Sequence, residues 1–143
     1  MEYAVAIRGE LENIEREMKL IERLIKKEGK DHLDDIEIRA AALSLSTIYN
    51  GMEKVIEFGL KKRETAIPAS GNWHASLLKL AEKNGLIDKE THSELLGFMG
   101  FRHFIRHAYS FQIDPAAITE ILKKCPKLVA SFCRQIESAI MAP

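Results

Sequence analysis

Hydrophobic side chains recur every three or four residues along most of the chain, which is the spacing of one face of an α-helix. The first seam fills the opening 28 residues and stops at Gly29, and the second begins near Asp31–Asp34 and runs to about Leu60. The two seams consist of Ile7, Leu11, Ile14, Met18, Ile21 and Ile25, and of Ile38, Ala41, Leu45, Ile48, Met52 and Val55. The pattern predicts two long helices joined by a short turn.

Capping and turn residues mark three further helices after a break at Pro68 and Gly71. The signals are Asn72 and Asn84-Gly85 at the two ends of a short third helix, Asp88 before a fourth, and Asp114-Pro115 before the last. An Asn or Asp at these positions accepts from the first free helical N–H groups, and proline fits the first helical position. Pro126 lies inside the last helix and is expected to kink or divide it near Lys124.

Four long helices and one short helix, joined by short loops, predict an all-α fold: an antiparallel four- or five-helix bundle. The sequence shows no strand pattern and no internal repeat. A length of 143 residues fits one domain, which we expect to span residues 1–143.

Small residues predict close helix packing in two places. Ala40, Ser44, Thr47 and Gly51 form a stripe along the second helix. Gly97 and Gly100 lie inside the fourth helix, where each glycine costs about 1 kcal/mol relative to alanine. Contact with another backbone is a reason to keep them.

Lys+Arg and Asp+Glu are balanced at 21 each, so any binding of nucleic acid must come from a local basic patch. No apolar run approaches the roughly 18–20 residues of a membrane span, and the N-terminus lacks a signal pattern. We therefore expect a cytoplasmic protein that does not bind membranes. Cys125 and Cys133 are about 12 Å apart on one helix, too far for a disulfide, and are expected to be reduced and buried.

Two arginines, two histidines and a tyrosine crowd the end of the predicted fourth helix: Arg102, His103, Arg106, His107 and Tyr109. Arginine presents a planar fork of donors to phosphate oxygens, and histidine exchanges protons near neutral pH. Arg102 and His107 are about 140° apart on an ideal helix. A loosened helix end or a second copy of the chain is therefore needed to aim both at one phosphate.

Each of these side chains also has an ordinary structural interpretation. Arg102 and Arg106 suit a solvated helix face, and Tyr109 suits a bundle aromatic with its hydroxyl at the rim. His103 and His107 have the spacing of two metal ligands, but no carboxylate or cysteine shares their turn, so we expect neither a metal nor a cofactor. No role is assigned to the remaining histidines, His32, His74 and His92.

The order Gly97-Phe98-Met99-Gly100-Phe101-Arg102, His107-Ala108-Tyr109 and Ile113-Asp114 resembles the HepT-like toxins of the HEPN superfamily. Their hallmark is Arg, four residues, His, one residue, Tyr, late in a bundle helix. The helix order and the length agree as well, so the resemblance covers essentially the whole chain and implies a HEPN-like bundle.

The resemblance implies a metal-independent endoribonuclease, the toxin of a toxin–antitoxin pair, acting as a homodimer on RNA through a 2′,3′-cyclic phosphate. His107 would be its general acid or base, and Arg102 would stabilise the phosphate. Tyr109 matches the tyrosine to which a nucleotidyltransferase antitoxin attaches AMP. His103 and Arg106 are expected to add phosphate contacts.

Two other functions stay open: a non-catalytic helical subunit that binds a nucleotidyltransferase and presents its substrate, and a relative that binds RNA without cutting it. Tyr49 and Glu53, one turn apart on the second helix, are either surface polar groups or support for the basic cluster. The triplet Lys61-Lys62-Arg63 is either a solvated helix end or part of an RNA surface.

Overall fold

The computed structural model describes residues 2–69, 71–107 and 113–141, and these residues form helices and connecting segments without a strand. The helices are α1 (Glu2–Lys30), α2 (Asp35–Lys62), α3 (Trp73–Lys83), α4 (Lys89–His107), α5 (Pro115–Ile136) and the π-helical turn η2 (Glu137–Met141). The predicted all-α helical bundle is confirmed. Among the described residues, no helix combines the length and the low polarity needed to cross a membrane.

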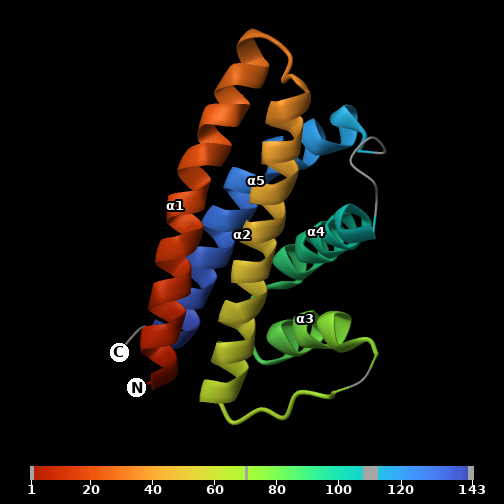
Figure 1. Cartoon of the computed structure of the whole chain (residues 1–143). Helices are drawn as coiled ribbons and strands as arrows, with labels where there is room; N and C mark the ends of the chain where they lie inside the picture. The colour runs from red at the N-terminus through yellow and green to blue at the C-terminus, as the bar shows by residue number, and fades with distance from the viewer. Residues whose placement is uncertain (1, 70, 108–112, 142–143) are drawn as a thin grey trace.

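The bundle is built around α2, which packs against α1, α3, α4 and α5. In Figure 1, α1 and α2 run side by side in opposite directions, and α3 and α4 lie on the side of α2 that faces away from α1. α5 descends beside α1 and α2, and it ends near the N-terminus of α1. This arrangement places the last turns of α4 next to the first half of α2.

The predicted hydrophobic seams form the core. All six predicted positions of the α2 seam are buried, and in α1 the seam is buried from Ile7 to Ile21. At the end of α1 the structure differs from the prediction, because Leu24 is buried while Ile25 is only partly buried. In the last turns of α1, Leu24 therefore faces the core in place of the predicted Ile25.

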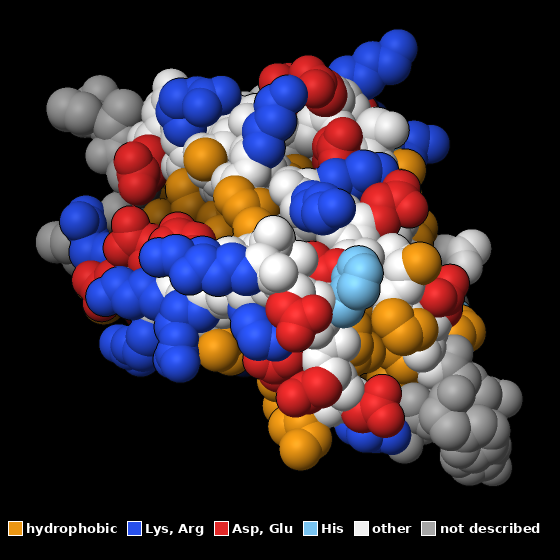
Figure 2. Space-filling view, turned by 90° about the horizontal axis from the view of Figure 1, so that it is seen from above, with side chains coloured by type: hydrophobic (Ala, Val, Ile, Leu, Met, Phe, Trp, Pro, Cys, Tyr) orange, Lys and Arg blue, Asp and Glu red, His pale blue; other side chains and the backbone are white. Residues whose placement is uncertain are grey.

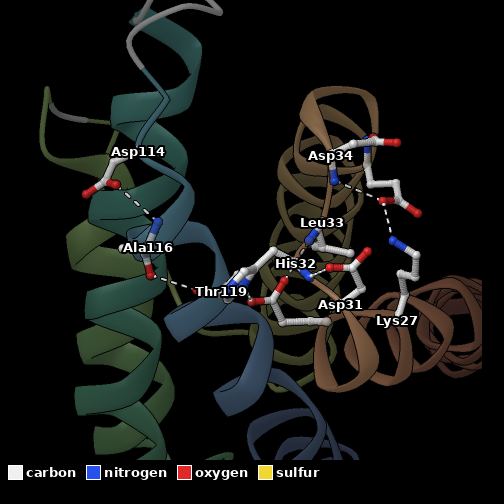
Figure 3. A network of polar contacts seen from close by, with 10 residues as sticks. Lys27, Asp31, His32, Leu33, Asp34, Asp114, Ala116 and Thr119 are labelled. Carbon is white, nitrogen blue, oxygen red and sulfur yellow. Dashed lines mark hydrogen bonds and ion pairs between the residues drawn. The ribbon is translucent and has the colours of Figure 1, made fainter.

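The connection between α1 and α2 is fixed by polar side chains (Figure 3). Asp34 caps α2 in a reciprocal capping box with Glu37. Glu28 accepts a hydrogen bond of 2.9 Å from the N–H of Leu33, and this bond holds the pKa of Glu28 below its ordinary value. The His32 ring contacts the same carboxylate at 3.2 Å. The turn is therefore held by side-chain acceptors for backbone N–H groups.

The other predicted caps have mixed outcomes. Asp88 accepts from the N–H of Thr91 at 2.8 Å, and Asp114 accepts from the N–H of Ala116 at 3.0 Å, so both N-caps are confirmed. Asn72 occupies the N-cap position of α3, but its side chain makes no capping hydrogen bond. Pro126 does not divide α5, since the helix is continuous from Pro115 to Ile136. The ribbon of α5 changes direction along its length in Figure 1.

The glycine predictions separate in the same way. A Cβ at Gly51 would lie 2.9 Å from Cγ1 of Ile14, so close packing of α1 on α2 is confirmed there. At Gly97 and Gly100 the prediction is wrong within one chain. Both glycines are exposed, and no atom of the described chain lies within 4 Å of a Cβ built at either position. The glycines of α4 leave a bare helix surface.

The basic triplet at the end of α2 includes a structural clamp. The guanidinium of Arg63 donates to the carbonyl oxygen of Asn84 and, at 3.0 Å, to that of Ala139. Lys61 pairs with Glu57 one turn earlier, while Lys62 is exposed. Arg63 therefore ties the end of α2 to the end of α3 and to η2.

Both cysteines are free thiols, as predicted. Cys125 is fully buried, and its burial raises the pKa of the thiol to about 12. Cys133 is only partly buried, and burial raises its pKa to about 11. Neither thiol has the depressed pKa of a reactive cysteine.

Candidate functional site around Arg102

The last turns of α4 carry the described part of the basic cluster. Arg102 is partly buried, whereas His103, Arg106 and His107 are exposed. Tyr109, the fifth predicted site residue, lies outside the described residues. All four described side chains come from α4. The groups that contact them from outside this helix must therefore come from its neighbours, α2 above all.

Arg102 is held against α2 by two contacts. Its Nε donates a hydrogen bond to Oδ1 of Asn50, and its guanidinium carbon lies 5.9 Å from the centre of the Tyr49 ring. At that distance the cation is attracted by the electron-rich face of the ring. Asn50 and Tyr49 restrict where the guanidinium can lie, and they leave its two terminal nitrogens without a hydrogen bond inside the described chain.

A buried polar chain continues from Tyr49 to α3. The Tyr49 hydroxyl donates to Oε2 of Glu53 at 2.8 Å, and Nδ1 of His74 lies 2.8 Å from the same oxygen. Tyr49 is fully buried and Glu53 is 8% exposed, while the His74 side chain is 43% exposed. The interpretation of Tyr49 and Glu53 as surface polar groups is therefore wrong, and they lie directly beneath Arg102.

The ionisation of Tyr49 is suppressed by its surroundings. Burial raises the pKa of its phenol, and the neighbouring Glu53 carboxylate raises it further by repulsion and by accepting the hydroxyl proton. Arg102 acts weakly in the opposite direction. Tyr49 consequently stays a neutral donor, and its ring remains a fixed platform under the guanidinium.

Aromatic packing fixes α4 against α2 at this level. The rings of Tyr49 and Phe98 are nearly parallel, with centroids 6.5 Å apart, and Phe98 meets Phe101 edge to face at 6.3 Å. Phe98 is almost fully buried. Because Phe98 lies one turn before Arg102 on α4, this contact sets the rotation of the helix and turns Arg102 toward α2.

The two histidines share a different surface. The rings of His103 and His107 are 4.6 Å apart, and both side chains are exposed. In the part of the chain that the structure describes, no hydrogen bond or ring contact joins either histidine to Arg102. Among the described residues, no group of three or more His, Cys, Asp or Glu side chains is arranged to hold a metal ion. Among the described residues, Arg102 thus contacts α2, while His107 contacts His103 on its own helix.

A groove of about 610 Å³ lies between α2 and α4 beside Arg102. The described residues that line it are Arg39, Ala42, Leu43, Ser46 and Asn50 from α2, Arg102, Ile105 and Arg106 from α4, and Ile113. Its lining contains three arginines and no carboxylate. The groove is thus a local basic patch on a chain whose overall charge is balanced.

Sequence reasoning missed three residues of this region. Arg39 and Asn50 were given no role, and His74 was given none because its partner Glu53 lies 21 positions away. A signal for the first two existed, since Arg39, Leu43, Ser46 and Asn50 recur at three- and four-residue steps and so share one face of α2. No local signal connects His74 to Glu53.

Comparison with known proteins identifies a family to which the chain is similar. A family model described as HepT-like protein matches residues 40–142. Searches among curated proteins and among solved structures gave no match. The matched segment covers most of the chain, from the groove face of α2 through the basic cluster to η2. The chain belongs to the HepT-like family of the HEPN superfamily.

Proposed function

We propose that this protein is a metal-independent endoribonuclease, the toxin of a toxin–antitoxin system, with Arg102 and His107 as its catalytic residues. The observation that carries the proposal is the position of Arg102, which is held by Asn50 and Tyr49 at the edge of an open basic groove. A guanidinium that is fixed in position and open to a ligand can stabilise the negative charge that develops on a phosphodiester during cleavage.

The proposed reaction needs only side chains and the RNA itself. His107 removes the proton of the ribose 2′-hydroxyl as general base, and the 2′-oxygen attacks the adjacent phosphorus. The bond from phosphorus to the 5′-oxygen breaks, and the imidazolium of His107 donates the proton that this leaving oxygen requires. The products are a 2′,3′-cyclic phosphate and a 5′-hydroxyl end, so DNA cannot be a substrate.

A homodimer is proposed to complete the site. Arg102 faces α2 while His107 lies on the open face of α4, so one chain presents the two groups in different directions. On an ideal helix Leu96, Gly100 and Phe104 lie within about 60° of His107. Leu96 is 39% exposed, Phe104 is 49% exposed, and Gly100 is bare. A second copy seated on this face would cover these apolar side chains and place the basic clusters of the two chains beside each other at one interface.

The test is cleavage of single-stranded RNA by the purified protein in EDTA. We expect fragments ending in a 2′,3′-cyclic phosphate, and a substrate with a 2′-deoxyribose at the cleavage position should stay whole. Arg102→Ala and His107→Ala should each reduce cleavage by at least about a hundredfold. Arg23→Ala, which changes an exposed arginine of α1, is the matched control.

Each alternative outcome identifies a different function. Intact RNA together with binding of a nucleotidyltransferase would support the non-catalytic subunit. RNA that is bound but never cut would support a relative that has lost catalysis. Cleavage that persists in the Arg102→Ala/His107→Ala double variant would refute the catalytic assignment.

A further inference from the structure

The groove between α2 and α4 extends well beyond the residues of the catalytic proposal. Arg39 lies about three turns before Asn50 on α2, and Arg106 lies one turn after Arg102 on α4. Arg39 and Arg106 are both exposed, so their guanidinium groups are available to a ligand. These positions put cationic side chains on both walls of the groove.

Part of the groove lining is apolar. Leu43, Ile105 and Ile113 line it together with Ala42, and the Leu43 side chain is 70% exposed. Burying such a side chain against a ligand removes apolar surface from water, which is favourable at about 25 cal/mol per Å². A ligand that suits this groove therefore has an apolar or aromatic part for these side chains and an anionic part for the arginines.

The charge of the groove distinguishes it from a second hollow and from the end of the bundle where α1 meets α2. The hollow between α4 and α5 carries Lys123, Lys124 and Lys127, but also Asp88, Glu90 and Glu94. At the end of the bundle where α1 meets α2, acidic and basic side chains are interspersed, with hydrophobic ones between them (Figure 2). The groove beside Arg102 joins three arginines to apolar side chains, without a carboxylate among its described residues.

From this combination we infer that the groove is a binding subsite for one nucleotide of single-stranded RNA next to the scissile phosphate, with Arg39 on the phosphate and Leu43 under the base. The inference rests on the proposed ribonuclease function. Single-stranded nucleic acid binds where cationic side chains follow the backbone and flat or apolar surfaces receive the bases. A volume of about 610 Å³ lies within the usual range of roughly 300–1,000 Å³ for ligand sites.

Arg39 is assigned to binding and Arg102 to catalysis, which separates their expected kinetics. A contact to a flanking nucleotide is present in both the ground state and the transition state, so its loss raises KM. A contact to the reacting phosphate is strongest in the transition state, so its loss lowers kcat. We expect Arg39→Ala to raise KM about three- to tenfold with kcat within about twofold of the parent.

Binding is measured separately from cleavage in the full chain carrying His107→Ala. The probe is a fluorescent single-stranded RNA 12-mer, titrated by anisotropy at several salt concentrations. Arg39→Ala in this background should weaken binding and lower the slope of log K against log salt by about 0.7, as expected for one lost phosphate contact on a single strand. Leu43→Glu should weaken binding roughly tenfold, since it places a carboxylate in the groove.

Matched controls come from α1. Arg23→Ala removes an exposed arginine, and Val5→Glu places a carboxylate at a side chain that is 69% exposed. Both should bind the RNA like the His107→Ala parent. A DNA strand of the same sequence should compete for the groove, because the contacts at Arg39 and Leu43 need no 2′-hydroxyl.

The outcomes separate this subsite from the proposed function. If the parent cuts RNA and Arg39→Ala has the same KM, affinity and salt slope, the subsite is wrong and the ribonuclease stands. If RNA is bound through Arg39 and Leu43 but never cut, the subsite stands and the ribonuclease fails. Light scattering is the last control: weaker binding that coincides with a fall in molecular mass would assign the groove to a second copy of the chain and overturn the subsite.

Discussion

The guanidinium of Arg102 lies over the ring of Tyr49, and the hydroxyl on the far edge of that ring donates to a buried carboxylate, Glu53. One tyrosine thus joins an accessible cation on α4 to a buried anion on α2. The His74 ring reaches the same carboxylate oxygen from α3. The neutral side chain of Tyr49 thus connects Arg102 with Glu53.

The hydroxyl of Tyr49 is expected to contribute to stability. Tyr49→Phe leaves the ring in place but removes the donor to Glu53, so a buried carboxylate loses one of its two partners. We expect a loss of about 1–3 kcal/mol in the free energy of unfolding, measured in urea. Tyr3→Phe, at a partly exposed tyrosine, should change it by less than about 0.5 kcal/mol.

A double-mutant cycle with Glu53→Leu locates this effect. In Tyr49→Phe/Glu53→Leu neither polar group of the pair remains, so the combined loss should be smaller than the sum of the two single losses. Strict additivity would mean that the 2.8 Å contact between the two side chains does not stabilise the fold.

The glycines of α2 and α4 are expected to respond in opposite directions to alanine. At Gly51 the new Cβ would meet Cγ1 of Ile14 at 2.9 Å, so Gly51→Ala should destabilise the fold by about 1–3 kcal/mol. At Gly97 and Gly100 there is open space, and alanine should stabilise a monomer by up to about 1 kcal/mol per site. Thermal unfolding of the three variants measures both effects.

The oligomeric state extends that comparison. If the bare face of α4 pairs with a second copy, as proposed, Gly100→Ala should weaken the dimer in sedimentation experiments even though the helix itself prefers alanine. A dimer unaffected by Gly100→Ala, and equally unaffected by Phe104→Ser, would show that this face does not hold two chains together.

Acid should loosen the connection between α1 and α2. The Leu33 N–H holds the pKa of Glu28 below its ordinary value of 4.5, so near that pH the unfolded chain binds more protons than the folded one. The stabilisation is therefore complete above pH 4.5 and is lost as the pH falls through the lower folded value. The melting temperature, measured from pH 3 to pH 7, should fall less steeply in Glu28→Gln than in the parent.

Exposed Glu12 is the matched control for this experiment, because it is also a carboxylate of α1. Glu12→Gln should follow the parent over the whole pH range. If Glu28→Gln and the parent lose stability in parallel on acidification, the carboxylate at the turn does not contribute to the pH dependence.

The AMP modification that the HepT-like resemblance implies for Tyr109 has a direct mass signature. Co-expression with a nucleotidyltransferase antitoxin should increase the intact mass in steps of about 329 Da, the mass that an attached AMP group adds. Tyr109→Phe should remove the increase, whereas Tyr3→Phe should leave it. An increase that survives in Tyr109→Phe would assign the acceptor to another residue.

The sequence by itself determined the helices and their ends. The seams at three- and four-residue spacing placed α1 and α2, and Asp34, Asp88 and Asp114 marked helix starts that the structure confirms as caps. These signals are reliable because they act within one or two turns, where the backbone geometry is fixed by the helix itself. The order of Arg102 and His107 along α4 was readable for the same reason.

Only the tertiary structure decided what those helices place side by side. It brought His74 to Glu53, set Arg102 over Tyr49, and opened a groove in which Arg39 joins the cluster of α4. It also left Gly97 and Gly100 bare, where the sequence predicted contact. The reason is physical: the rotation and separation of two helices follow from side chains that interlock across the whole core, and no local stretch of sequence contains that information.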